Sequence, residues 1–150
     1  GPGGLSAAYF LAIMGHKPTI FEKRSKLGGM LRYGIPNYRL PKNRLDEDIN
    51  AILSTGNIEI RYNTAVSRDV TMEQLLEEYN AVYIAIGAQV GKTVNVEGVH
   101  SKGVYSAVDM LGEIGRGNIP DYTGKRVVVV GVAMLPWTVP VLRFGAMQKR

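Results

Sequence analysis

Apolar residues along the first part of the chain change from helical to strand-like spacing. Residues 5–15 read "LSAAYFLAIMG", in which apolar positions recur every three or four residues, so we expect a helix that Gly15 ends. The following "PTIFEK" predicts a short buried strand over residues 18–23. Glycine and proline interrupt any steady period over residues 24–42, which indicates a loop.

The same change of spacing continues through the middle of the chain. Apolar positions over residues 45–53 predict a helix, and the alternating "NIEIRYN" at 57–63 predicts a strand. "TMEQLLEEY" predicts a further helix, because Thr71 and Gln74 are in capping-box register. The almost wholly apolar "NAVYIAIGA" at 80–88 is typical of a strand that is buried on both faces of a parallel sheet.

The last third of the chain predicts one more helix and one more strand. "SAVDMLGEIG" is helical in spacing, with Ser106 and Asp109 in capping register, and "RVVVVG" at 126–131 predicts a buried strand. Helices that alternate with strands indicate a doubly wound α/β fold. No apolar run reaches the roughly 18 to 20 residues that a membrane span needs, so we expect a cytoplasmic protein without a membrane partner.

Composition and charge narrow the classes of function. The chain has no cysteine, which excludes disulfides, thiolate catalysis and an iron–sulfur cluster held by these 150 residues. The net charge of +5 is uneven, because residues 1–44 carry eight Lys and Arg against the single acid Glu22. The sequence contains no recognisable nucleic-acid-binding module, so this basic end favours a small phosphate-bearing ligand over nucleic acid.

The glycine-rich "GPGG" leads directly into the first expected helix. In a G-x-G-x-x-G dinucleotide motif, Gly1 and Gly4 match the second and third glycines, and the helix that opens at Leu5 would direct its amides at phosphates. Glu22 ends the next strand, at a spacing close to the roughly twenty residues expected of an acid that binds ribose. This spacing does not separate FAD from NAD, and a loose glycine-rich end with a solvated Glu22 is the simpler alternative.

Longer stretches point to a particular family. "EKRSKLGGMLRYGIPNYRLPK", "LDEDINAIL" and "YNAVYIAIGA" closely resemble the FAD domain of the glutamate synthase small-subunit family of FAD- and NAD(P)H-dependent oxidoreductases, over about residues 1–131. The resemblance implies a Rossmann-like FAD-binding domain over 1–120 that lacks its first strand. It also implies that 121–150 begin a truncated NAD(P)-binding domain with its first strand.

The resemblance also implies a chemistry. FAD would accept a hydride from NADPH and pass electrons to iron–sulfur clusters, which would lie on other segments or on a partner such as the large glutamate synthase subunit. The final electron acceptor and the choice between NADPH and NADH stay open. No side chain is typical of a nucleophile or a general base, so the catalytic residues stay unknown, and we predict no metal site.

The candidate cofactor contacts come from the glycine motif and from the resemblance together. The resemblance places the Gly28 and Gly29 loop along FAD, Leu31 and Arg39 near the flavin, and Val66 near the adenine. Gly87 of "IAIGA" would let the backbone pass near the pyrophosphate. The full set of candidate cofactor-binding residues is Gly1, Pro2, Gly3, Gly4, Leu5, Glu22, Lys23, Gly28, Gly29, Leu31, Arg39, Val66, Ala85, Gly87 and Gly131.

Several of these contacts have purely structural alternatives. The two glycines of the loop can form a plain turn, Arg39 can pair with an acid of 46–48, and Gly87 can end a strand. Tyr33 and Tyr38 can stack on a ring or pack in the interior.

The end of the sequence departs from the family pattern. "RVVVVGVAMLPWTVPVLRFGAMQKR" keeps only Gly131 of a second glycine turn, and Pro136 and Pro140 lie where a helix would continue. We therefore expect a fragment with a damaged NAD(P) motif, and a non-catalytic nucleotide-binding fragment is the functional alternative. A plain NAD-binding dehydrogenase domain is disfavoured by the inserted "LGGMLRYGIP" loop.

Overall fold

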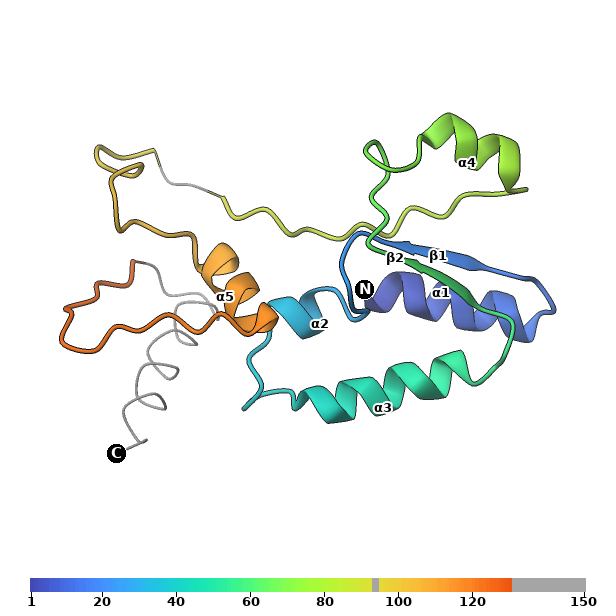
Figure 1. The fold of residues 1–150 in the computed structure, drawn as a ribbon, viewed down its shortest axis with the longest axis horizontal. Helices are drawn as coiled ribbons and strands as arrows, with labels where there is room; N and C mark the ends of the chain where they lie inside the picture. The colour runs from blue at the N-terminus through green and yellow to red at the C-terminus, as the bar shows by residue number, and fades with distance from the viewer. Residues whose placement is uncertain (93–94, 131–150) are drawn as a thin grey trace. The chain divides into compact units, whose positions relative to one another are not determined.

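The computed structural model describes residues 1–92 and 95–130, which divide into two compact units (Figure 1). One unit comprises residues 1–32 and 37–88, and the other comprises 33–36 and the residues from 89 onward. The elements are, in chain order, α1 (Pro2–Ile13), β1 (Thr19–Glu22), α2 (Met30–Tyr33), α3 (Lys42–Leu53), β2 (Glu59–Tyr62), α4 (Met72–Glu78) and α5 (Ala107–Arg116).

Helix α1 begins earlier than its apolar spacing predicts, at Pro2, with Gly1 as its N-cap. Proline is favoured at the first helical position, because its fixed φ suits a helix and its missing N–H would have no intrahelical partner there. The helix ends at Ile13, and Gly15 follows its C-cap as expected, with a φ of +91° and an amide that donates to the Ala12 carbonyl at 3.0 Å. Its buried side consists of Leu5, Ala8 and Ala12.

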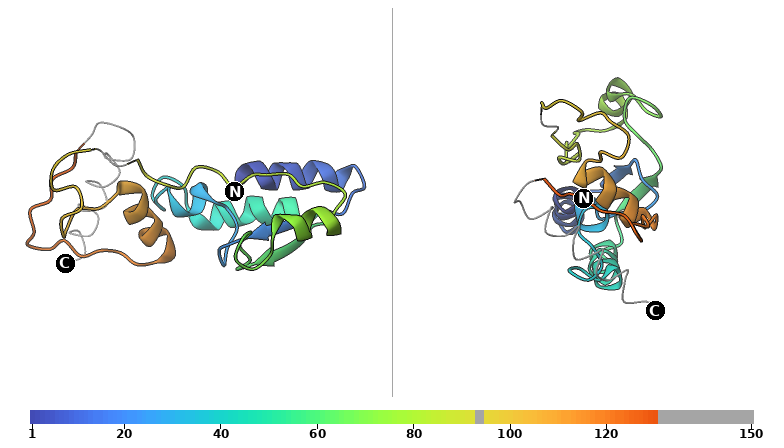
Figure 2. Two further views of the ribbon diagram at one scale, coloured as in Figure 1. Left: turned by 90° about the horizontal axis from the view of Figure 1, so that it is seen from above. Right: turned by 90° about the vertical axis from the view of Figure 1, so that its left-hand side faces the viewer.

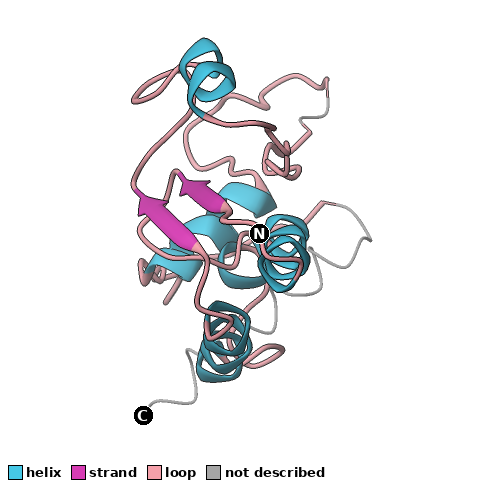
Figure 3. Cartoon of the chain, turned by 90° about the vertical axis from the view of Figure 1, so that its right-hand side faces the viewer, coloured by secondary structure: helices cyan, strands magenta, loops and turns pink. Residues whose placement is uncertain are grey.

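Strands β1 and β2 pair in parallel, with Thr19 opposite Glu59 and Glu22 opposite Tyr62 (Figure 3). Parallel neighbours need a crossover connection, which α3 supplies. Side chains alternate between the two faces of this pair. Helices α1 and α3 lie side by side on one face, and α4 lies on the other side (Figures 1 and 2).

The hydrophobic core of the first unit lies between α1, α3 and the strand pair. Helical periodicity places Leu45 and Ile49 one turn apart on α3, where they pack with Leu5 and Leu27. Partly buried apolar side chains surround this cluster: Ile20, Leu31, Ile52, Leu53 and Ile60. The two predicted strands and the two predicted helices of this region are therefore confirmed.

The predicted strand at 80–88 is wrong. This segment forms no ladder, and its apolar side chains are largely exposed, with Ile86 at 79%. A strand requires a neighbour that satisfies its backbone groups, and the only strand ladder in the described residues joins β1 to β2.

The predicted strand at 126–131 is wrong over the part that the structure describes. Residues 126–130 form no regular element, and Val128 is 85% exposed. They too have no neighbouring strand among residues 1–92 and 95–130. Gly131, Pro136 and Pro140 lie outside the described residues.

The two predicted capping boxes have different outcomes. At α4 the box is confirmed, since Gln74 N donates to Thr71 Oγ1 at 3.2 Å and Thr71 N donates to Gln74 Oε1 at 2.9 Å. At α5, Ser106 is the N-cap but its side chain makes no capping hydrogen bond, so the predicted box is wrong there. The Ser106 hydroxyl faces the backbone of Gly91 instead, because a Cβ placed on Gly91 would lie 2.3 Å from Ser106 Oγ.

None of the helices in the described ranges is both long and apolar enough to cross a membrane.

Candidate nucleotide-binding site

The amino end of α1 presents backbone amides that the helix itself does not use. The first intrahelical bond of this turn joins Leu5 N to the Gly1 carbonyl at 3.1 Å, so Gly3 and Gly4 have no acceptor within the helix. The first turn contains no acidic side chain that would occupy them. Pro2 and Gly3 are exposed, while the Leu5 side chain is buried in the core. This helix end can therefore bind an anion through its amides and its dipole.

The Gly28 and Gly29 turn lies directly against this helix end. A Cβ placed on Gly29 would fall 2.7 Å from Gly1 Cα, and Gly29 has a φ of +53°. Gly28 has a φ of +118°, and a Cβ there would lie 3.1 Å from Leu45 Cδ2. Both positions thus require glycine. Both residues are buried, yet no described residue accepts a hydrogen bond from either amide, as expected if a ligand does so.

Two further candidates lie on the segment that follows α4. A Cβ placed on Gly4 would lie 3.4 Å from Ala85 Cβ, so a small residue at 85 lets this segment approach the first turn of α1. Gly87 has a φ of +68°, is exposed, and has no atom near the position that a Cβ would take. The structure thus places Ala85 against the first turn of α1, and it leaves open space around Gly87.

Glu22 is the last residue of β1, at the carboxyl edge of the strand pair. Its Oε1 accepts a hydrogen bond from Arg24 N at 3.0 Å, and its backbone carbonyl accepts one from Thr64 N at 3.0 Å. These contacts leave Oε2 without a protein partner among the described residues. The half-buried carboxylate is therefore held in place with one oxygen available, while its neighbour Lys23 is exposed.

Val66 lies in the loop that follows β2, and its side chain is exposed. Two contacts order this loop: Ser67 N donates to the Val70 carbonyl at 2.8 Å, and Ala65 N donates to Asp69 Oδ2 at 2.8 Å. The hydrogen bond from Arg68, together with the Ala65 amide, lowers the pKa of Asp69. A charged Asp69 thus fixes the loop that carries the candidate adenine contact.

Arg39 is exposed and makes no hydrogen bond or ion pair with any described residue. Its alternative pairing with an acid of 46–48 is not formed, because Asp46 binds Arg32 and Glu47 binds Arg44. Leu31 is half-buried against the core, so its side chain serves packing in this structure.

Sequence patterns did not identify Arg32 and Lys42 as residues that support the candidate site. Arg32 is 5% exposed, and it donates from Nε to the Leu27 carbonyl and from its guanidinium to Asp46. Lys42 Nζ donates to the Leu31 carbonyl at 2.8 Å, and its pKa is lowered by partial burial and by nearby Arg32. An arginine in a segment that the sequence predicts as a loop indicates a solvated charge. The spacing of nearby residues does not reveal that Arg32 pairs with Asp46, fourteen residues away.

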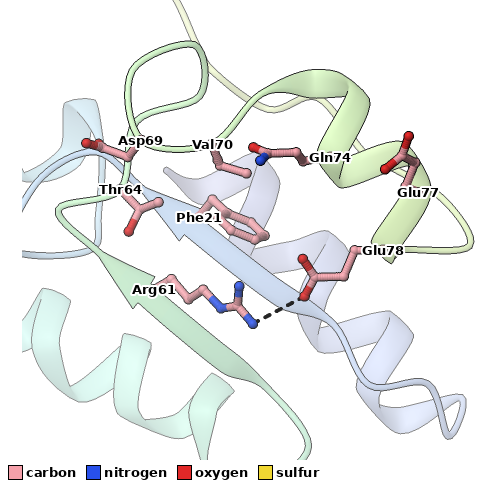
Figure 4. A pocket seen from close by; sticks show the side chains of 8 residues that line it. All are labelled: Phe21, Arg61, Thr64, Asp69, Val70, Gln74, Glu77 and Glu78. Atoms are coloured by element: carbon pink, nitrogen blue, oxygen red, sulfur yellow. Dashed lines mark hydrogen bonds and ion pairs between the residues drawn. The ribbon is translucent and has the colours of Figure 1, made fainter.

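A concavity lies on the other face of the strand pair, beneath α4 (Figure 4). It is an open groove of about 520 Å³, lined by Phe21, Arg61, Thr64, Asp69, Val70, Gln74, Glu77 and Glu78. Arg61 lies over the Phe21 ring at 5.3 Å and bonds Glu78 at 3.4 Å. The other charged groups of the groove are acidic, so it does not suit a diphosphate.

No group of three His, Cys, Asp or Glu side chains in the described parts of the chain could hold a metal ion. The candidate site therefore consists of the glycine turns, Glu22 and the loop around Val66, which is a set of ligand-binding groups.

Known proteins are similar to this chain in sequence and in fold. Residues 1–61 match the family described as an NAD(P)-binding Rossmann-like domain. The chain is 45% identical over 133 residues to the NADP(+)-dependent formate dehydrogenase subunit beta of Moorella thermoacetica. This alignment covers 87% of this chain and 19% of that protein. It is 36% identical over 140 residues to the glutamate synthase [NADPH] small chain of Bacillus subtilis (strain 168), covering 87% and 28% respectively.

This chain is a homologue of part of the glutamate synthase small chains and their relatives. The predicted resemblance is thereby confirmed. The chain also superposes on Mycobacterium tuberculosis FprA in complex with NADPH with a TM-score of 0.77, at 22% identity, over 91% of this chain and 32% of FprA. The chain thus has a Rossmann-like NAD(P)-binding α/β fold. It spans less than a third of the length of each of these three proteins.

Proposed function

We propose that residues 1–120 belong to the FAD-binding domain of a flavin-dependent NAD(P)H oxidoreductase, and that 121–150 begin its NAD(P)H-binding domain. One observation carries the proposal: the Gly28 and Gly29 turn packs on the amino end of α1, beside the strand pair whose carboxyl edge holds Glu22. These three sequence motifs lie within a single compact unit, and together they would form one site.

The residues at this site suit a dinucleotide. The amides of Gly3 and Gly4 would bind the pyrophosphate, and the carboxylate of Glu22 would accept hydrogen bonds from ribose hydroxyls. When bound, FAD supplies two-electron acceptance from a nicotinamide nucleotide and one-electron release. The chain's own part is to bind and orient the cofactor, in keeping with the absence of a nucleophile or general base among its candidates.

The loop between β1 and α3 favours FAD over a plain NAD domain. A plain NAD-binding unit passes from the acidic strand end into its next helix, whereas here residues 23–41, which include α2, lie between β1 and α3. That insertion brings the Gly28 and Gly29 turn back to α1, where the backbone amides of these two buried residues would bind a pyrophosphate.

The relatives and the composition together favour a multi-subunit enzyme. The relatives are named as a subunit beta and a small chain, and their names specify NADP(+) and NADPH. We infer that NADPH is the electron donor. We also infer that the iron–sulfur clusters lie on other segments or on a partner such as a large glutamate synthase subunit, since these 150 residues contain no cysteine.

Flavin binding tests this proposal directly. The full-length protein that contains this sequence should purify with a flavin absorbance spectrum and reduce a dye when NADPH is added. Glu22→Gln should weaken FAD binding about tenfold to a hundredfold, as expected for a lost charged hydrogen bond. Asp48→Asn, an exposed acid on α3, is the matched control and should leave affinity unchanged.

Two outcomes contradict the proposal in different ways. A colourless protein that binds no FAD would exclude the flavin domain. Tight binding of FAD or ADP without NADPH-driven reduction would favour the non-catalytic nucleotide-binding fragment instead.

A further inference from the structure

A buried arginine lies on α2, the short helix that directly follows the Gly28 and Gly29 turn. Arg32 Nε donates to the carbonyl of Leu27, the residue immediately before Gly28, and its guanidinium donates to the Asp46 carboxylate on α3. A buried guanidinium must have such partners, because removing its charge from water without them is costly. Arg32 therefore joins α3 to the backbone that leads into the turn.

The other end of the loop is tied to the same helix. Lys42 Nζ donates to the Leu31 carbonyl at 2.8 Å, just after the turn. Within the loop, Leu31 N and Arg32 N donate to the Gly28 and Gly29 carbonyls, each at 3.1 Å. The turn is thus a short hydrogen-bonded unit whose two flanks are both held by the first half of α3.

The turn has little room to move between its neighbours. On one side, a Cβ placed on Gly28 would lie 3.2 Å from Arg32 Cβ and 3.1 Å from Leu45 Cδ2. On the other side, a Cβ placed on Gly29 would lie 2.7 Å from Gly1 Cα. Because Arg32 and the amino end of α1 enclose the turn, a shift of the Arg32 backbone would move the turn relative to the helix end.

We propose that Arg32 is a positioning residue for the dinucleotide: anchored by Asp46, it fixes the Gly28 and Gly29 turn beside the amino end of α1. This role rests on the proposed function, because it assumes that a pyrophosphate binds there. Arg32 itself does not touch the ligand in this assignment, since its charge is neutralised by Asp46 and its Nε is used by Leu27. AMP has no pyrophosphate, so its binding should not depend on the turn.

The test compares FAD and AMP affinities of the full-length protein and its variants, with circular dichroism to show that each variant is folded. Arg32→Met should weaken FAD binding about tenfold to a hundredfold, and AMP binding by less than about twofold. Arg32→Lys should recover part of the loss, because it keeps the charge but not the forked geometry.

Two more variants complete the design. Asp46→Asn should weaken FAD binding by a smaller factor. Arg44→Met is the matched control, since Arg44 is exposed and bonds only Glu47 of its own helix, and it should bind FAD as the unmodified protein does.

Each remaining outcome decides the matter. Unchanged FAD affinity in folded Arg32→Met, or equal losses for FAD and AMP, would overturn the positioning role. If Arg32→Met does not fold, Asp46→Asn decides in its place, because that carboxylate side chain is 51% exposed and its loss should not unfold the domain. If the unmodified protein binds neither FAD nor AMP, the proposed function fails and the positioning role fails with it. If it binds both and no variant differs, only the positioning role fails.

Discussion

Strand β1 and the segment at 80–88 are two apolar stretches of one compact unit with opposite outcomes. β1 pairs with β2 along its full length and rests on the core through Ile20. Residues 80–88 carry more apolar side chains, yet Ile84 and Ile86 are exposed and the segment has no ladder. The difference teaches that apolar content does not make a strand, because backbone groups also require a neighbouring strand.

The same contrast separates the glycines of the two regions. Gly29 lies in contact with the amino end of α1, whereas Gly87 has a similar positive φ in open space. At Gly29 the neighbouring backbone leaves no room for a Cβ, whereas at Gly87 only the positive φ favours glycine. Substitutions in the two regions can therefore measure how far packing extends into the segment at 80–88.

The largest difference should come from paired glycine substitutions. In the chain of residues 1–150, Gly29→Ala combines a strained φ with a Cβ 2.7 Å from backbone, and should lower the free energy of unfolding by about 3 kcal/mol. Gly87→Ala has a φ of +68° but no clash, and should cost about 1 kcal/mol. Urea unfolding of both variants measures the gap. Equal losses of unfolding free energy would show that the turn at residues 28 and 29 moves to accommodate a Cβ at no added cost.

The next difference should come from isoleucines on the two apolar stretches. Ile20→Ala removes a half-buried side chain that packs on the core, and should cost about 2 kcal/mol. Ile86→Ala alters a side chain that is 79% exposed, and should change the free energy of unfolding by less than about 0.5 kcal/mol. Urea titrations of the same chain compare them. A cost at residue 86 as large as that at residue 20 would mean that the segment is packed in solution.

Local signals predicted those parts of the fold that local contacts determine. Apolar spacing predicted α1, α3, β1 and β2, because each has a face that packs on one shared core. The predictions of strands at 80–88 and 126–130 were wrong. A strand ladder depends on a neighbouring strand, and the spacing of apolar residues within a segment does not reveal one.

The candidate site divides in the same way. The requirement for glycine at 28 and 29 and the place of Glu22 at a strand end follow from motifs. The burial of Arg32 does not, because it depends on how α3 packs beside the loop and brings Asp46 within reach. The remaining assignments, including Arg39, Val66 and Gly87 as cofactor contacts, stay predictions that ligand binding must test.

The smallest difference should come from the two helix caps, which have the same sequence signal and different contacts. Thr71→Ala removes a formed capping bond and should lower the local stability of α4 by about 1 kcal/mol. Ser106→Ala removes a hydroxyl that makes no capping bond, so α5 should change by no more than a few tenths of a kcal/mol. Amide hydrogen exchange measured within each helix reports these local values separately. If Ser106→Ala accelerates exchange in α5 as much as Thr71→Ala does in α4, then the Ser106 hydroxyl caps α5 in solution. Its position near Gly91 would then not prevent it from forming the capping hydrogen bond.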